Sequence, residues 1–208
     1  MRKRFSTFVT KQFGHPSGLI GRYIGNGMAK RNVYDARWTV SLLDLQPQQH
    51  VLEIGFGPGV STQIVAEKAS QGFVAGIDHS QTMVQAASQR NAHAIQAGRM
   101  ELKQGKVASL PYPDESFDIA LSLHSIYFWQ NPVDCLKEIR RVLKPNGTVA
   151  ITILPKDKWV QNLDPSAMTL YFGKDIASMF AEAGYRNVHV EAPPKEARSS
   201  LECVIGAK

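Results

Sequence analysis

The chain has 208 residues, 43% of them hydrophobic and 20% charged, so it can bury a core and is not a disordered or fibrous protein. Two cysteines, Cys135 and Cys203, are too few for a disulfide framework or a multi-thiolate metal site, and we interpret them as free thiols of a reducing compartment. We find no apolar run of about 18 residues for a membrane span, and no signal-peptide stretch behind the basic start. We therefore expect a soluble, cytoplasmic protein.

The net charge of +6 is concentrated at the start of the chain. Residues 1–37 hold eight Lys and Arg against a single acid, Asp35, and the remainder is nearly neutral. Such an arm attracts phosphates, anionic membrane surfaces or acidic substrates, or is simply a solvated helical face. We divide the chain into a basic N-terminal helical arm or lid, residues 1–46, and a domain of residues 47–208.

Taken in chain order, the arm shows helical apolar spacing over residues 5–13, a glycine-proline turn over 14–18 and a second helical pattern over 33–45. From His50 onward, strand and helix patterns alternate. The expected strands are 50–55, 73–78, 100–104, 116–123, 148–154, 186–191 and 199–205. The expected helices are 60–69, 80–97, 132–143 and 173–183, with a sharp turn over 144–147. This alternation predicts an α/β fold with a parallel sheet covered by helices on both faces.

A glycine-rich turn joins the first strand of the domain to its first helix, Glu53-Ile-Gly55-Phe-Gly57-Pro-Gly59. Glycines allow a tight turn there and let backbone amides approach a ligand at the helix N-terminus. Asp78 ends the next strand, where a carboxylate can accept hydrogen bonds from both ribose hydroxyls. Val60 stands where a dinucleotide fingerprint needs glycine, and Glu53 suits an ammonium group better than a pyrophosphate. The pattern favours a nucleoside with a zwitterionic amino-acid tail over a nicotinamide dinucleotide.

Four sequence blocks carry a resemblance to a known family: Val51–Gly59, Gly76–Met83, Leu110–Asp118 and Leu136–Gly147. Through them the chain resembles the class I S-adenosylmethionine-dependent methyltransferases, in the small-molecule, quinone-methylase-like (methyltransferase type 11) group. The resemblance implies a Rossmann-like, doubly wound sheet of seven strands, six parallel and the last antiparallel between two others. It makes residues 47–208 the S-adenosylmethionine-binding domain, with S-adenosylhomocysteine as product, and we expect no metal.

The resemblance also assigns the residues that contact S-adenosylmethionine. It gives Glu53 the methionine end, Asp78 the ribose, His79 and Met83 the adenine, and backbone access to Gly55, Gly57 and Gly59. Gly105-Lys106-Val107 departs from the Gly-Asp-Ala common in the family, so the Val107 backbone is left to contact the adenine edge.

The segment Leu123–Trp129 follows the fourth strand of the domain at its carboxyl end, beside the expected methyl donor. Methyl transfer from a sulfonium mainly needs alignment and exclusion of water, and a base only when the acceptor carries a proton. We expect His124 as the catalytic base. The expected acceptor pocket has aromatic walls and a histidine from the arm: Tyr127, Phe128, Trp129 and His15. The alternative interpretation of each aromatic residue is that it is buried in the core, and the alternative for His15 is that it is a plain turn residue.

The predicted function is methyl transfer from S-adenosylmethionine to a small-molecule acceptor by in-line displacement. An Asn/Asp-Pro-Pro-Tyr motif, a cysteine set for arsenic and a paired-glutamate loop are not found, which disfavours amide, arsenic and protein-arginine acceptors. Three alternatives stay open. Residues 1–37 could bind RNA phosphates, the Phe5, Phe8 and Phe13 stripe could dock a lipid methylase on an anionic membrane, or the chain could be a non-catalytic nucleoside-binding module.

Overall fold

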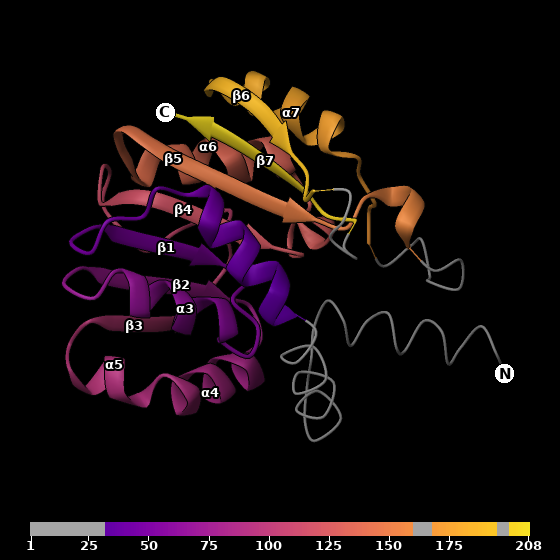
Figure 1. The fold of residues 1–208 in the computed structure, drawn as a ribbon. Coiled ribbons are helices and arrows are strands. Elements are labelled where there is room, and N and C mark those ends of the chain that lie inside the picture. The colour runs from indigo at the N-terminus through magenta and orange to yellow at the C-terminus, as the bar shows by residue number, and fades with distance from the viewer. Residues whose placement is uncertain (1–31, 160–167, 195–199) are drawn as a thin grey trace, which may run out of the picture.

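The computed structural model describes residues 32–159, 168–194 and 200–208 (Figure 1). The expected helix over residues 5–13, the glycine-proline turn with His15, and most of the basic arm lie outside the described residues.

The described strands form one seven-stranded sheet in the order β3-β2-β1-β4-β5-β7-β6 (Figure 1). β7 runs antiparallel to both of its neighbours, β5 and β6, and the other neighbouring pairs are parallel. This confirms the doubly wound sheet with an inserted antiparallel last strand. The strands are β1 His50–Ile54, β2 Phe73–Asp78, β3 Met100–Gln104, β4 Phe117–Leu123, β5 Leu143–Ile153, β6 Arg186–Glu191 and β7 Glu202–Ala207.

Helices cover both faces of this sheet. They are a helix over residues 32–42, α3 Val60–Lys68, α4 Gln81–Arg90, α5 Ala92–Gln96, α6 Pro132–Val142 and α7 Gly173–Glu182, with 3-10 turns η1 Ile126–Phe128 and η2 Lys156–Lys158. None of the helices in the described ranges has the length and apolar character needed to cross a bilayer.

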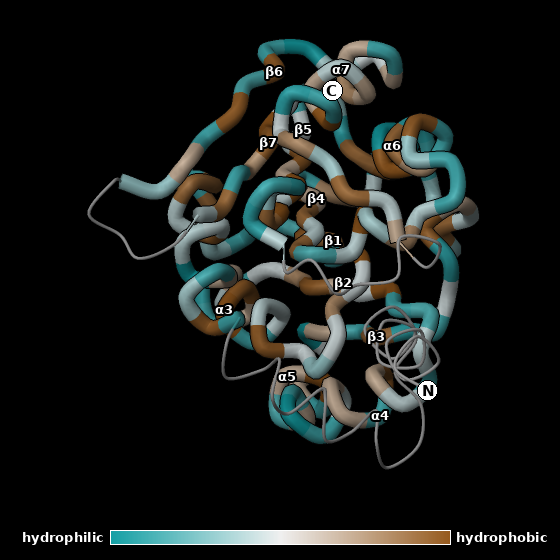
Figure 2. The backbone as a smooth tube through the Cα atoms, turned by 90° about the vertical axis from the view of Figure 1, so that its right-hand side faces the viewer, coloured by the Kyte–Doolittle hydropathy of each residue, from teal (hydrophilic) through white to brown (hydrophobic). Residues whose placement is uncertain are grey.

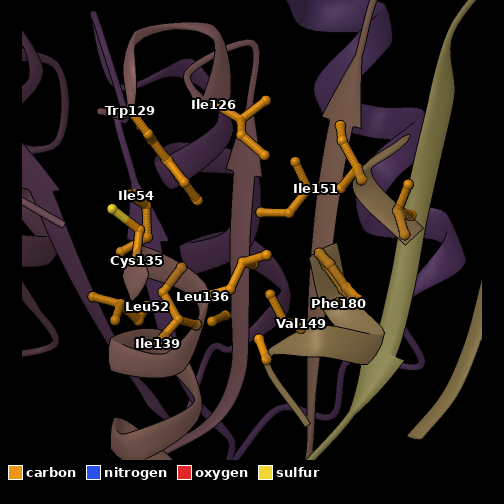
Figure 3. Packing of buried hydrophobic residues seen from close by; sticks show 14 of the residues in the cluster. Leu52, Ile54, Ile126, Trp129, Cys135, Leu136, Ile139, Val149, Ile151 and Phe180 are labelled. Atoms are coloured by element: carbon orange, nitrogen blue, oxygen red, sulfur yellow. The ribbon is translucent and has the colours of Figure 1, made fainter. Parts of the chain in front are cut away.

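Alternating side chains of the strands supply two apolar layers, one for each face. In β1, Leu52 and Ile54 join the cluster that contains Ile139 of α6 and Phe180 of α7 (Figure 3). Val51 joins the opposite cluster, with the helix over 32–42 and α3. The brown strands at the centre of Figure 2, between helices with teal outer positions, show the same arrangement. Burial on both faces explains why these strands read as continuous apolar runs.

The helix over residues 32–42 is attached to the domain by its buried side. Ala36 and Val40 lie in the apolar cluster on that face. Beside them, the Thr39 and Thr152 hydroxyl oxygens are 2.7 Å apart, and neither residue is exposed to solvent. This end of the expected arm therefore shares the core of the domain, and the division at residue 46 stays a prediction.

Two local expectations were wrong. The single helix expected over 80–97 is two helices, because the chain breaks at Asn91, whose Nδ2 donates to the Gly59 carbonyl at 3.1 Å and the Ala87 carbonyl at 2.9 Å. The turn expected over 144–147 lies inside β5, where Asn146 takes a φ of 63° and the β4–β5 register shifts between Phe117 and Ile119.

Candidate functional site

A cavity of about 630 Å³ lies at the carboxyl edge of the sheet, among the segments that follow β1, β2, β3 and β4. Its volume falls within the range of about 300–1,000 Å³ typical of small-molecule and cofactor sites. The structure brings most of the predicted site residues together here: Glu53, Gly55, Gly57, Asp78, His79, Met83, Val107, His124, Phe128 and Trp129.

Of the predicted residues that the structure describes, Gly59 and Tyr127 do not line this cavity. A Cβ on Gly59 would lie 2.7 Å from the Ala87 Cβ, so this glycine permits close packing of α3 on α4. Tyr127 is 2% exposed, and its hydroxyl accepts from the Leu154 amide at 2.6 Å and donates to the Leu154 carbonyl at 3.1 Å. Burial raises the Tyr127 pKa well above its usual range. Tyr127 therefore belongs to the core of the domain.

The glycine bend after β1 and the acid at the end of β2 meet, as the spacing predicts. The Gly57 amide donates to Asp78 Oδ2 at 2.8 Å, and the Ser80 amide donates to Asp78 Oδ1 at 2.9 Å. Gly57 has a φ of 53°, with no atom within 4 Å of the position its Cβ would take, so the backbone is open toward a ligand. The carboxylate is thus fixed at the bend, on the cavity wall.

Glu53 is the buried acid of the site, with 1% of its surface exposed. The Ser61 hydroxyl of α3 donates to Glu53 Oε1, and the neighbouring Thr62 side chain also stabilises the charged form of the carboxyl. Burial raises the Glu53 pKa from 4.5 to about 7, although these two contacts oppose the shift. A buried acid in the lining of a cavity fits a cationic group of a ligand.

His124 follows β4 and is paired with an acid from the helix over 32–42. Its Nε2 lies 2.9 Å from Asp35 Oδ2, and the two side chains are 17% and 19% exposed. The His124 amide donates to the Thr152 carbonyl at 2.9 Å, although the residue has a φ of 55°, which non-glycine residues seldom adopt. His124 lines the cavity, and Asp35 contacts it from a distant part of the chain.

Sequence reasoning missed Asp35 as a site residue. The one available signal was its place as the single acid among eight basic residues. Several polar residues at the cavity were also missed: Asn32, Ser61, Ser125, Gln130, Asn131, Asp134 and Cys135. Burial raises the pKa of Cys135, at the start of α6, to about 11. Within the described ranges, no three His, Cys, Asp or Glu side chains gather as metal ligands.

The sheet order, the glycine bend and the acid at the end of β2 define a nucleoside-binding domain of the methyltransferase type. Residues 52–151 match the family model described as "Methyltransferase domain". Over these residues, just under half of its length, the chain is similar to methyltransferases.

Three proteins illustrate this similarity. The uncharacterized methyltransferase YdaC of Bacillus subtilis is 29% identical over 173 residues, which cover 83% of this chain and 90% of YdaC. The ubiquinone/menaquinone biosynthesis C-methyltransferase UbiE of Geotalea daltonii is 34% identical over 119 residues, covering 55% of this chain but only 49% of UbiE. The crystal structure of an S-adenosylmethionine-dependent methyltransferase from Aquifex aeolicus matches with a TM-score of 0.71 at 22% identity, covering 83% of this chain and 89% of that chain.

Proposed function

We propose that this chain binds S-adenosylmethionine in the cavity at the carboxyl edge of the sheet and methylates a small-molecule acceptor there. One observation carries the proposal: a single cavity is lined by the buried acid Glu53, by Asp78 at the glycine bend and by His124. These groups suit the ammonium, the ribose and the reacting end of such a ligand, in that order. S-adenosylmethionine, when bound, supplies a methyl group already activated on a sulfonium.

The chain's own residues bind and orient the methyl donor. Glu53, ionised, accepts from the ammonium group, and its burial strengthens that charge pairing. Asp78 accepts from the ribose hydroxyls while backbone amides hold it in place. Met83, which is 2% exposed, packs against the base together with His79 and the Val107 backbone. The backbone at Gly57 leaves room for the ligand, whereas Gly55 lines the cavity and permits the close approach of Ser125.

The acceptor end of the cavity contains His124, Phe128 and Trp129. The two aromatic side chains exclude water and favour an acceptor with an apolar face, and His124 is placed to remove a proton. The UbiE protein is named for quinone biosynthesis, which supports an acceptor of small-molecule size. We expect no metal to take part.

The alternative acceptors depend mainly on residues 1–31, which lie outside the described ranges. Binding of RNA or of an anionic membrane would use residues 1–37, closure of a lid would use His15, and these stay predictions, as does a cytoplasmic location. Full-length protein that binds RNA salt-sensitively, or that sediments with anionic vesicles, would support the first two.

Calorimetry with S-adenosylhomocysteine tests the proposed donor site. Asp78→Ala should weaken binding at least tenfold, about the 1–3 kcal/mol expected when a charged hydrogen-bonding partner is lost. Asp44→Ala, a matched change at an exposed acid that does not line the cavity, should bind like the wild type. Thermal melts check that both variants fold. Equal affinity in all three proteins would contradict the proposal.

A further inference from the structure

The helix over residues 32–42 contacts the end of the sheet through two polar residues on one face. Asp35 and Thr39 are four positions apart, so their side chains lie on the same side of the helix. Thr39 meets the Thr152 hydroxyl at 2.7 Å, and Asp35 meets His124 Nε2 at 2.9 Å. The Thr152 carbonyl in turn accepts from the His124 amide at 2.9 Å. Three short contacts therefore fix the backbone and the ring of His124 relative to this helix.

The contact with Asp35 determines which ring nitrogen of His124 can accept a proton. A carboxylate only accepts hydrogen bonds, so the Nε2 facing Asp35 carries the hydrogen of the neutral ring. Nδ1 makes no hydrogen bond to the described residues and keeps its lone pair, on a residue that lines the cavity. A φ of 55° in a non-glycine residue is costly, and such a conformation is kept where the surroundings enforce it.

We propose that Asp35 is a positioning residue that holds His124 as the base for an acceptor hydroxyl carried on an aromatic ring. This inference rests on the proposed function, because it concerns the acceptor end of the same cavity. The inference goes beyond the proposed function by assigning a role to Asp35 and by naming the acceptor class.

The chemistry of a neutral imidazole selects this acceptor class. Proton transfer is efficient when the acidities of donor and base lie within a few units, and a phenol, with a pKa of about 10, satisfies this for histidine. An alkyl hydroxyl is far less acidic, and an ionised carboxylate acceptor needs no base. The aromatic side chains of Phe128 and Trp129, which line the same cavity, suit the flat face of such a ring.

The transfer step balances with this assignment. The phenolic oxygen forms a bond to the methyl carbon, and the bond between that carbon and the sulfonium sulfur breaks, its electron pair remaining on sulfur. The phenolic proton moves to His124 Nδ1, which makes the ring cationic. The Asp35 carboxylate, already within hydrogen-bond distance of Nε2, stabilises that positive charge.

A phenol that reports its own ionisation tests the inference without knowledge of the natural acceptor. 4-Nitrophenol absorbs visible light only as the phenolate, so we add it at about pH 6 to protein saturated with S-adenosylhomocysteine, the pH being low enough to keep most free probe neutral. The wild type should bind the probe and raise its ionised fraction. Asp35→Asn should lower the ratio of ionised to neutral bound probe about tenfold, as expected for loss of a charged hydrogen-bond partner, and Asp35→Glu should partly restore it.

Two further variants separate proton transfer from folding. His124→Asn removes the imidazole with a residue that tolerates positive φ, and it should abolish the phenolate signal. Asp44→Asn repeats the acid-to-amide change at an exposed site and should leave the signal unchanged.

The outcomes distinguish the inference from the proposed function. Protein that binds S-adenosylhomocysteine but neither binds nor ionises nitrophenol would overturn the inference and leave the donor site standing. An equal phenolate signal in wild type and Asp35→Asn would also overturn it. Failure to bind S-adenosylhomocysteine at all would instead contradict the proposed function.

Discussion

Replacing Glu53 by glutamine should make the ligand-free protein more stable at neutral and alkaline pH, although the acid lies in the proposed donor site. Its pKa rises from 4.5 to about 7 on folding because the carboxyl is buried. At about 1.4 kcal/mol per unit, ionising it costs about 3 kcal/mol more in the folded chain than in the unfolded chain. Because the folded state holds the proton more tightly than the unfolded state, the protonated Glu53 carboxyl contributes to the free energy of unfolding. This contribution is fully present below pH 4.5 and is lost as the pH rises through about 7.

Between about pH 5 and pH 8, the wild type should therefore lose about 2.5 kcal/mol that Glu53→Gln retains. For a chain of this length, the difference corresponds to a relative shift of about 5–10 °C in melting temperature. Denaturant titrations of both proteins at the two pH values, without ligand, measure it. An identical pH dependence in the two proteins would refute the reasoning from burial.

The same acid makes the binding of S-adenosylhomocysteine depend on pH. Pairing with an ammonium requires the ionised carboxylate, so binding near pH 7 should release about half a proton. Calorimetry in buffers of different ionisation enthalpy measures this release. Glu53→Gln should release none and bind at least tenfold more weakly at about pH 8. Equal proton release by the variant would show that another group titrates.

Two further comparisons test the local geometry of the site. Gly55→Ala places a Cβ 2.5 Å from the Ser125 Cβ at a φ of 72°, and denaturant titration should show a loss of about 2–4 kcal/mol, whereas Gly57→Ala, with open space, should lose only about 1–2 kcal/mol. Equal losses of stability in the two variants would show that the positive φ alone, and not the contact with Ser125, determines the cost. Tyr127→Phe leaves the Leu154 amide without its hydrogen-bond partner, while the Leu154 carbonyl keeps the Trp159 Nε1 donor at 2.9 Å. The change should cost about 1–3 kcal/mol in the same assay. The affinity of this variant for S-adenosylhomocysteine should stay within about twofold of the wild type. A larger loss of affinity would show that Tyr127 contributes to the binding site.

The sheet and the donor end of the site could be predicted because their signals are local in the sequence. Apolar runs bounded by glycine and acidic residues located the strands, and the fixed order of such units brings Asp78 to the Gly57 amide. The break at Asn91 was missed because helical periodicity continues across it. Only the packed structure shows that its amide is drawn to the Gly59 carbonyl.

The acceptor end could be predicted only in part, because it depends on contacts between distant segments. Asp35 and His124 are 89 positions apart, and nothing in either local pattern indicates which face of the helix over 32–42 meets the end of β4. Within the aromatic run, Phe128 and Trp129 line the cavity whereas Tyr127 points into the core. The 3-10 turn over Ile126–Phe128 produces this division, and a run of adjacent aromatic residues does not reveal it.

The burial of the two native cysteines makes the chain suitable for site-specific labelling. Cys135 at the cavity and Cys203 on β7 are 2% and 0% exposed, and burial raises their pKa values to about 11 and about 12. Near neutral pH both thiols stay protonated and shielded from solvent, so they should not react with maleimides. A cysteine introduced at Tyr34, which is 47% exposed on the helix over 32–42, would then carry a single fluorophore. Its emission could report how the environment of that helix responds to each added ligand.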